Sequence, residues 1–342
     1  MVVFDEGIYQ KVSAVTPGKV ILFGEHFVVY GYPSIIASIE RYFSVDISFY
    51  PEAKGAVQII SNLGFSATKM GIDIKFETTP SKDHLEIVSK LYKIIDYLNG
   101  VEVIQKDPKK GKFIIKLDSQ LPLGGGLGSS SAFCVALAAS FVYYNQRVID
   151  KVKICKTSID AEKLINIDTS GADCTVSTFG GLGRYDKKYG YTRIDSQCSD
   201  IEFLVVDTGN AHDTYTMIQK VSKIKENNPT MFSEVCDSYS VIYQEGLKCL
   251  QENNLERLGI LLSKNHALLS KLSVSNNIIE KIVDICQSHG AFGTKITGAG
   301  GGGCIISLID KKKDNKTLEN RLKDLNLRYF FTGLNSTGIR II

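Results

Sequence analysis

The sequence predicts an α+β protein made of two lobes. With 342 residues, the chain is long enough for about two domains of ordinary size. Strand-like runs separated by glycines dominate its first half, whereas apolar residues at helical three-to-four spacing dominate the second. Two further strand-like runs follow those helices. We therefore place the lobes at residues 1–184 and 185–342, each with its own mixture of strands and helices.

The first lobe is predicted to begin with strands and continue with helices. Alternating or β-branched residues indicate strands over 12–17, 42–50, 56–61 and 113–119. One amphipathic helix is expected to begin near Ser129 and run to about residue 146, and a second to span roughly Ile149 to Leu164. A glycine-rich turn over 179–190 closes this lobe.

The second lobe is predicted to be mostly helical. It opens with a strand over 201–209, and helical periodicity then covers 213–226, 231–251, 255–272 and 276–290. Strands over 302–310 and 328–342 flank a last helix at about 312–325.

Composition excludes several classes of protein. A net charge of +3 gives no support for a nucleic-acid binder. The longest apolar stretch, residues 132–144, is shorter than the roughly 20 residues that a membrane span needs. The eight cysteines are widely spaced, with no CxxC pair for zinc or redox chemistry. Because MVVFDEGIYQ also lacks the pattern of a signal peptide, we expect a reducing, cytoplasmic location.

The most informative segment is LPLGGGLGSSSA, residues 121–132, which follows a strand and leads into a helix. Its glycines allow the backbone to approach a ligand closely, and its serines lie at a helix N-terminus, where free N–H groups attract anions. A flexible turn with a serine cap would explain only part of this pattern. The segment is therefore interpreted as a phosphate-binding loop, although it lacks the lysine of a Walker A motif.

A second glycine-rich loop lies in KITGAGGGGC, residues 295–304. It contains the letters of G-x-G-x-x-G from Gly298 to Gly303, but a strand follows, whereas a dinucleotide-binding fingerprint must open a helix. We interpret it as a glycine-rich hairpin lying against a ligand or another loop. A purely structural turn stays open at this point.

Charged residues mark two other segments. Lys19, Glu25 and His26 interrupt the apolar run PGKVILFGEHFVVYG (residues 17–31), and each needs a partner if it is buried. A structural ion pair would account for them equally well. Glu162 and Asp173 are two carboxylates that could divide the work at a phosphate site, one holding Mg²⁺ and the other acting on a substrate hydroxyl. Alone, this pair is weak evidence.

Taken together and in this order, the PGK…GEH, PLGGGLGSSSA and KITGAGGGG segments resemble the three motifs of the GHMP kinase superfamily. The resemblance extends from about Val12 to the end of the chain, and it is strongest to the mevalonate kinases. It implies the two-lobed GHMP kinase fold, with an N-terminal lobe similar to ribosomal protein S5 domain 2 and a ferredoxin-like α/β C-terminal lobe.

The resemblance also implies an activity. ATP and (R)-mevalonate would give ADP and 5-phosphomevalonate, a step of the mevalonate pathway of isoprenoid biosynthesis, with Mg²⁺ as cofactor and ATP as co-substrate. It further implies a homodimer, with no nucleic-acid or membrane partner.

The resemblance assigns roles to individual residues. Asp173 would accept the proton of the C5 hydroxyl, and Lys19 would stabilise charge between that hydroxyl and the γ-phosphate. Ser130 and Glu162 would hold Mg²⁺, while Glu25, His26 and Asp173 would face mevalonate. The nucleotide would contact Lys19, Asn62, Ser119, Gly124, Gly125, Gly126, Leu127, Gly128, Ser129 and Ser130. Ser131 and Cys174 depart from the family pattern, which more often has alanine and asparagine at these positions.

Other interpretations are less favoured by the residues. Another kinase of the superfamily, acting on phosphomevalonate or a sugar, is the main alternative. A phosphorylated acceptor would call for a cluster of basic residues, which Glu25 and His26 do not supply. A non-catalytic nucleotide-binding regulator would be expected to lack a catalytic group, yet Lys19, Glu162 and Asp173 are all present. An NAD-dependent enzyme is disfavoured by the context of the second glycine loop.

Overall fold

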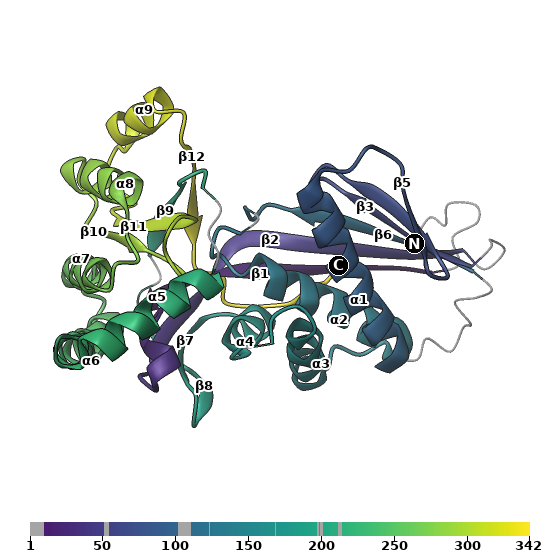
Figure 1. Cartoon of the computed structure of the whole chain (residues 1–342), viewed down its shortest axis with the longest axis horizontal. Coiled ribbons are helices and arrows are strands. Elements are labelled where there is room, and N and C mark those ends of the chain that lie inside the picture. Colours follow the sequence, from purple (N-terminus) through teal and green to yellow (C-terminus); the bar gives the residue numbers. More distant parts are fainter. Residues whose placement is uncertain are drawn as a thin grey trace.

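The computed structural model describes residues 10–50, 55–101, 111–122, 124–167, 169–196, 198, 201–210 and 214–342. Within these ranges, two sheets form the centres of two lobes (Figure 1). The predicted α+β class is confirmed. No helix among the described residues is long and apolar enough to cross a bilayer.

The first sheet is mostly antiparallel, and its main path runs in the order β13-β1-β2-β6-β3-β4-β5, in which β3 and β6 are parallel. β7 pairs with β2, and β8 pairs with β7. The strands are β1 (Gln10–Phe23), β2 (Ser34–Tyr50), β3 (Ala56–Ser61), β4 (Ser66–Met70), β5 (Asp73–Phe76), β6 (Lys112–Ser119), β7 (Leu182–Asp186), β8 (Gly190–Arg193) and β13 (Arg340–Ile341).

Helices cover this sheet. They are α1 (Lys82–Val101), α2 (Ser129–Gln146), α3 (Lys151–Lys163) and α4 (Ala172–Phe179), with a short 3₁₀ turn at Phe27–Tyr30. α2 and α4 pack against β1 and β2, and α3 packs against both helices. α2 is buried on nearly every side, which fits its run of small and apolar residues. It lies at the centre of the lobe and fixes where the preceding glycine loop ends.

The second sheet has the antiparallel order β10-β11-β9-β12. Its strands are β9 (Glu202–Asp207), β10 (Gly293–Ile296), β11 (Cys304–Ile309) and β12 (Arg328–Gly333). α7 and α8 contact this sheet and α6 packs on α7, on the left in Figure 1. The helices are α5 (Thr214–Asn227), α6 (Pro229–Gln251), α7 (Leu255–Lys271), α8 (Asn277–Ser288) and α9 (Lys316–Asp324).

The two lobes are not separated at a single point of the chain. The expected boundary between residues 184 and 185 falls inside β7, which pairs with β2 of the first sheet. The second sheet begins at Glu202, and after β12 the chain returns to the first sheet as β13. One apolar cluster contains buried residues from both lobes, so they share a continuous core.

Candidate active site

The three segments singled out in the sequence meet where the lobes join. The loop over residues 124–128 approaches β1 on one side, because the Lys19 N–H donates to the carbonyl of Leu127 at 2.9 Å. On the other side, the Cys304 N–H donates to the carbonyl of Gly125 at 2.9 Å. β10 and β11 flank the second glycine loop, which confirms the expected hairpin. The 124–128 loop is therefore held between β1 and the second glycine loop.

Two glycines of the 124–128 loop are required by close packing. Gly126 and Gly128 have φ angles of 78° and 72°, in the left-handed region that glycine favours. A Cβ on Gly126 would lie 2.7 Å from the carbonyl oxygen of Thr297, and one on Gly128 would lie 2.9 Å from Cγ of Lys19. Side chains here would push the second glycine loop and the lysine away from the site.

The loop ends at the N-terminus of α2, beside a cavity of about 200 Å³. Ser129 and Ser130 line the cavity together with Gly124, and its other walls are mostly apolar, including Leu117 and Phe133. Free N–H groups next to an apolar hollow suit a ligand with an anionic and an apolar part.

Asn62 and Ser119 lie beside that cavity and are bound to each other. The Ser119 N–H donates to Oδ1 of Asn62 at 3.0 Å, and the Asn62 amide donates to the Ser119 carbonyl at 3.1 Å. Neither lines the cavity, whereas Leu63 and Leu117 next to them do. Their contact with a nucleotide stays a prediction.

Lys19 and Asp173 form an ion pair at the same place, with Nζ 3.1 Å from Oδ2. Lys19 follows an irregularity in the pairing of β1 with β2, and Asp173 lies in the first turn of α4. The lysine side chain is 4% exposed and that of the aspartate 33%. One carboxylate is therefore both open to a ligand and fixed beside a buried cation.

Glu162, at the end of α3, is buried close by and accepts three hydrogen bonds. Its donors are the hydroxyl of Ser131, the hydroxyl of Thr169 at 2.6 Å and the thiol of Cys174 at 3.5 Å. Burial raises the pKa of Glu162, and the nearby charge of Asp173 raises it further. A bound cation would relieve both effects.

Ser130 and Ser131 lie in different surroundings, and the assignment of Ser130 to Mg²⁺ stays a prediction. Ser130 is exposed and lines the cavity, whereas the buried Ser131 contacts Glu162. Thr169 was also absent from the predicted site. The departures of Ser131 and Cys174 from the family pattern were the available signal, because both side chains contact the same carboxylate.

Glu25 and His26 lie at the end of β1, facing the second lobe. The carboxylate of Glu25 forms an ion pair with Lys295 of β10, and neither side chain has exposed surface. His26 Nε2 is 2.7 Å from the carbonyl oxygen of Ala299, and burial lowers the pKa of the imidazole. The structural ion pair considered for this segment is thus present at Glu25, and contact of either residue with an acceptor stays a prediction.

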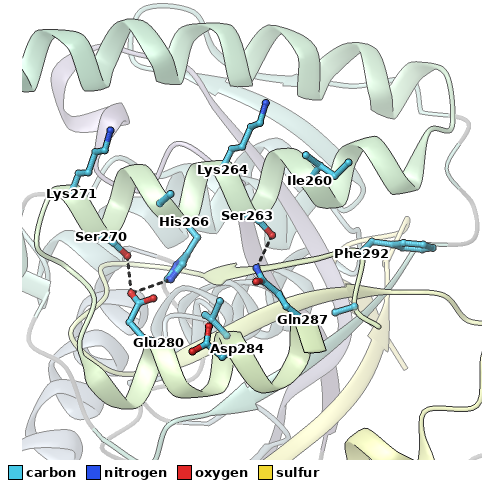
Figure 2. A pocket seen from close by; sticks show the side chains of 13 residues that line it. Ile260, Ser263, Lys264, His266, Ser270, Lys271, Glu280, Asp284, Gln287 and Phe292 are labelled. Carbon is cyan, nitrogen blue, oxygen red and sulfur yellow. Dashed lines mark hydrogen bonds and ion pairs between the residues drawn. The ribbon is translucent and has the colours of Figure 1, made fainter. Parts of the chain in front are cut away.

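A wider hollow of about 910 Å³ lies between α7 and α8, and residues of the two glycine loops do not line it (Figure 2). His266 extends from α7 toward Glu280 of α8, with Nε2 3.3 Å from Oε1, and Ser270 donates to the same carboxylate at 2.8 Å. Gln287 donates to Ser263 at 2.9 Å. None of the predicted site residues lines this hollow.

The fold and the three glycine-containing segments define a kinase of the GHMP class. The family model described as the GHMP kinases N-terminal domain matches residues 89–181, and that described as GHMP kinases C terminal matches residues 247–326.

Curated relatives are more specific. The mevalonate kinase of Pyrococcus furiosus is 33% identical over 312 residues, covering 89% of this chain and 90% of the relative. That of Methanocaldococcus jannaschii is 33% identical over 319 residues, covering 90% and 95%. The chain belongs to the mevalonate kinase family.

Solved structures agree. The mevalonate kinase of L. major, in complex with R-mevalonate, superposes with a TM-score of 0.82 at 25% identity, covering 98% of this chain and all of that one. The Methanococcus jannaschii enzyme gives 0.79 at 29% identity, covering 96% and 99%. A galactokinase from Lactococcus lactis, at 16% identity and a TM-score of 0.70, shares the fold.

Proposed function

We propose that this protein transfers the γ-phosphoryl group of ATP to the C5 hydroxyl of (R)-mevalonate. The observation that carries the proposal is the Lys19–Asp173 ion pair beside the 124–128 loop, with its carboxylate one-third exposed and its lysine buried. The family resemblance implies that an acceptor hydroxyl and the terminal phosphate of ATP would meet at this pair.

Each member of the pair has a distinct task. Asp173 accepts the hydroxyl proton as the C5 oxygen bonds to the γ-phosphorus, and the bond from that phosphorus to the oxygen it shares with the β-phosphate breaks, releasing ADP. Lys19 supplies a fixed positive charge to the alkoxide and the transferred group. Because phosphoryl transfer needs little covalent help, holding both substrates in line accounts for most of the rate.

The nucleotide is assigned to the loop and the adjoining cavity. Backbone N–H groups of residues 124–130 would bind its phosphates at the N-terminus of α2. The apolar walls near Leu117 and Phe133 would receive its base. Asn62 and Ser119, which are hydrogen-bonded to each other, are assigned as further contacts on the nucleotide side.

Ser130 and Glu162 are assigned to Mg²⁺, which would neutralise charge on the ATP phosphates. The residues fit such an ion, since Glu162 is a buried carboxylate with a raised pKa and Ser130 offers a hydroxyl from the phosphate loop. Among the described residues no three His, Cys, Asp or Glu side chains cluster as a metal cage. Mg²⁺ commonly takes one or two protein ligands and completes its shell with phosphates and water.

Magnesium titration tests this assignment. Glu162→Gln and Ser130→Ala should each raise the Mg²⁺ concentration for half-maximal rate several-fold, because each removes one of few protein ligands. Ser131→Ala serves as a comparison, since Ser131 is assigned only to orienting Glu162. An unchanged magnesium requirement in both ligand variants would place the ion elsewhere.

The acceptor is tested by an ADP-release assay with mevalonate, phosphomevalonate, galactose and homoserine. We expect mevalonate to give the highest kcat/KM, and preference for another acceptor would overturn the proposal in favour of another kinase of the class. The homodimer and the cytoplasmic location implied by the family resemblance stay predictions.

A further inference from the structure

Lys295 joins the second lobe to the first from a fully enclosed position. Its ammonium group donates to the carboxylate of Glu25 and, at 3.2 Å, to the carbonyl of Ile21 on β1. The other oxygen of Glu25 accepts from the side-chain amide of Asn265 on α7 at 3.2 Å. Both Glu25 oxygens are thus bound by protein groups, and the ion pair crosses between the lobes.

The residues next to Lys295 fasten the second glycine loop to the same part of β1. The Ile21 N–H donates to the hydroxyl of Thr297 at 2.9 Å, and His26 Nε2 contacts the Ala299 carbonyl at 2.7 Å. Thr297 in turn packs its carbonyl against Gly126. Any shift of Lys295 would therefore move the surface on which the phosphate loop rests.

Connecting the two lobes through the buried charges of Glu25 and Lys295 is energetically costly, because both groups lose their hydration. An ion pair removed from water is often no more stabilising than apolar residues of the same size, so a gain in stability does not by itself explain it. Burial lowers the pKa of Lys295, whereas the charge of Glu25 raises it. The charge of Lys19 also lowers that pKa.

We propose that Lys295 and Glu25 are positioning residues that hold the 297–303 loop against the 124–128 phosphate loop. This rests on the proposed function and deepens it. It gives Glu25 a role other than the acceptor contact implied by the family resemblance, because the carboxylate acts through Lys295 and has no exposed surface.

The decisive variant is the double substitution Glu25→Gln with Lys295→Met, which leaves no buried charge unpaired. It is compared with wild type, with Lys295→Met alone, and with Arg257→Met, which removes a different ion pair, between α7 and Glu245 of α6. Each protein is measured for melting temperature, for kcat and KM with ATP, and for amide hydrogen exchange of residues 297–304.

We expect Lys295→Met to lower the melting temperature and the double variant to restore much of it. In the double variant, kcat should still fall on the order of 10²-fold, and amides of the loop should exchange at least about tenfold faster. Arg257→Met should change neither kcat nor loop exchange. If Lys295→Met does not fold, the double variant carries the same test.

A double variant that keeps kcat within about twofold of wild type would overturn the proposal, because the pair would then serve stability alone. A lower kcat without faster loop exchange would also overturn the proposal, because the pair would then affect turnover without holding the 297–303 loop in place. Failure of the proposed function is recognised separately, because it concerns which acceptor wild type uses, while loop exchange requires no acceptor.

Discussion

Two lysine–carboxylate pairs lie near the glycine loops, and they differ in what surrounds the carboxylate. Asp173, beside Lys19, is one-third exposed, whereas Glu25, beside Lys295, is completely enclosed. An exposed carboxylate can exchange its partner for a substrate, and water can stabilise it if the lysine is lost. An enclosed one can do neither. The open pair, Lys19–Asp173, therefore suits chemistry. The closed pair, Lys295–Glu25, suits the alignment of the loops around it.

Asp173→Asn tests the open pair most severely. The amide keeps the shape of the side chain but cannot take a proton, so turnover should fall about 10²–10⁴-fold. ATP binding measured by calorimetry should be retained. As a control, Asp160→Asn removes an exposed carboxylate of α3 that pairs with Lys163, and its turnover should stay near wild type. A variant at position 173 that keeps more than a tenth of wild-type turnover would remove Asp173 as the base.

Lys19→Met separates the two pairs by their effects. Turnover should drop about 10²–10³-fold through loss of one fixed charge at the reacting atoms. The melting temperature should change little, because the remaining Asp173 is partly solvated. Lys295→Met should instead lower the melting temperature strongly, since Glu25 would be left buried and unpaired. Thermal unfolding and single-turnover rates on the same preparations check this, and a stability loss in Lys19→Met without a rate loss would contradict it.

Gly126→Ala probes the contact that the closed pair is proposed to hold. The new methyl group would meet the Thr297 carbonyl at 2.7 Å, so turnover should fall about tenfold. Gly190→Ala is a matched control outside the phosphate loop, because its φ of 72° is also left-handed but its Cβ would meet nothing within 4 Å. Both variants share the backbone strain of a left-handed alanine. They differ in that only Gly126→Ala places a methyl group against Thr297, so only this variant should displace the second loop. Equal turnover in the two would argue against that contact.

The smallest expected effect is the pH dependence of stability that comes from His266, which lies near the closed pair. Burial lowers the pKa of His266, and Ile296, next to Lys295, donates its N–H to this ring at 3.4 Å. At His266, the unfolded chain therefore binds more protons than the folded one below about pH 6.5. The contribution of His266 to stability is fully present above that pH and decreases as pH falls toward its folded pKa.

Melting temperatures measured from about pH 7.5 to 5.5 should decline in wild type and decline less in His266→Gln. Some slope should remain, because burial lowers the pKa of His26 as well. Parallel curves for the two proteins would show that His266 does not contribute.

Local patterns predicted most of the elements and the three loops. The helix α1 was not predicted, although Val88, Leu91, Ile95 and Leu98 have the spacing of its buried face. The contacts of the site were harder to predict, because they depend on which strands meet. Nothing near Glu25 in the sequence indicates Lys295, since β1 and β10 belong to different sheets. The contact of Ser131 with Glu162 was not predicted, because it depends on which side of α2 is buried.

The short strand β13 has a consequence for how the chain folds. Ala14 pairs with Ile341 and Val15 with Arg340, so the first sheet gains its edge strand from the opposite end of the chain. Closing so long a loop has a high entropic cost unless the intervening residues are already compact. The second lobe must therefore collapse before this pairing becomes favourable, and we expect β13 to join β1 in a late, slow phase of folding. The strand that carries Lys19 would then acquire its last neighbour only when the rest of the molecule is in place.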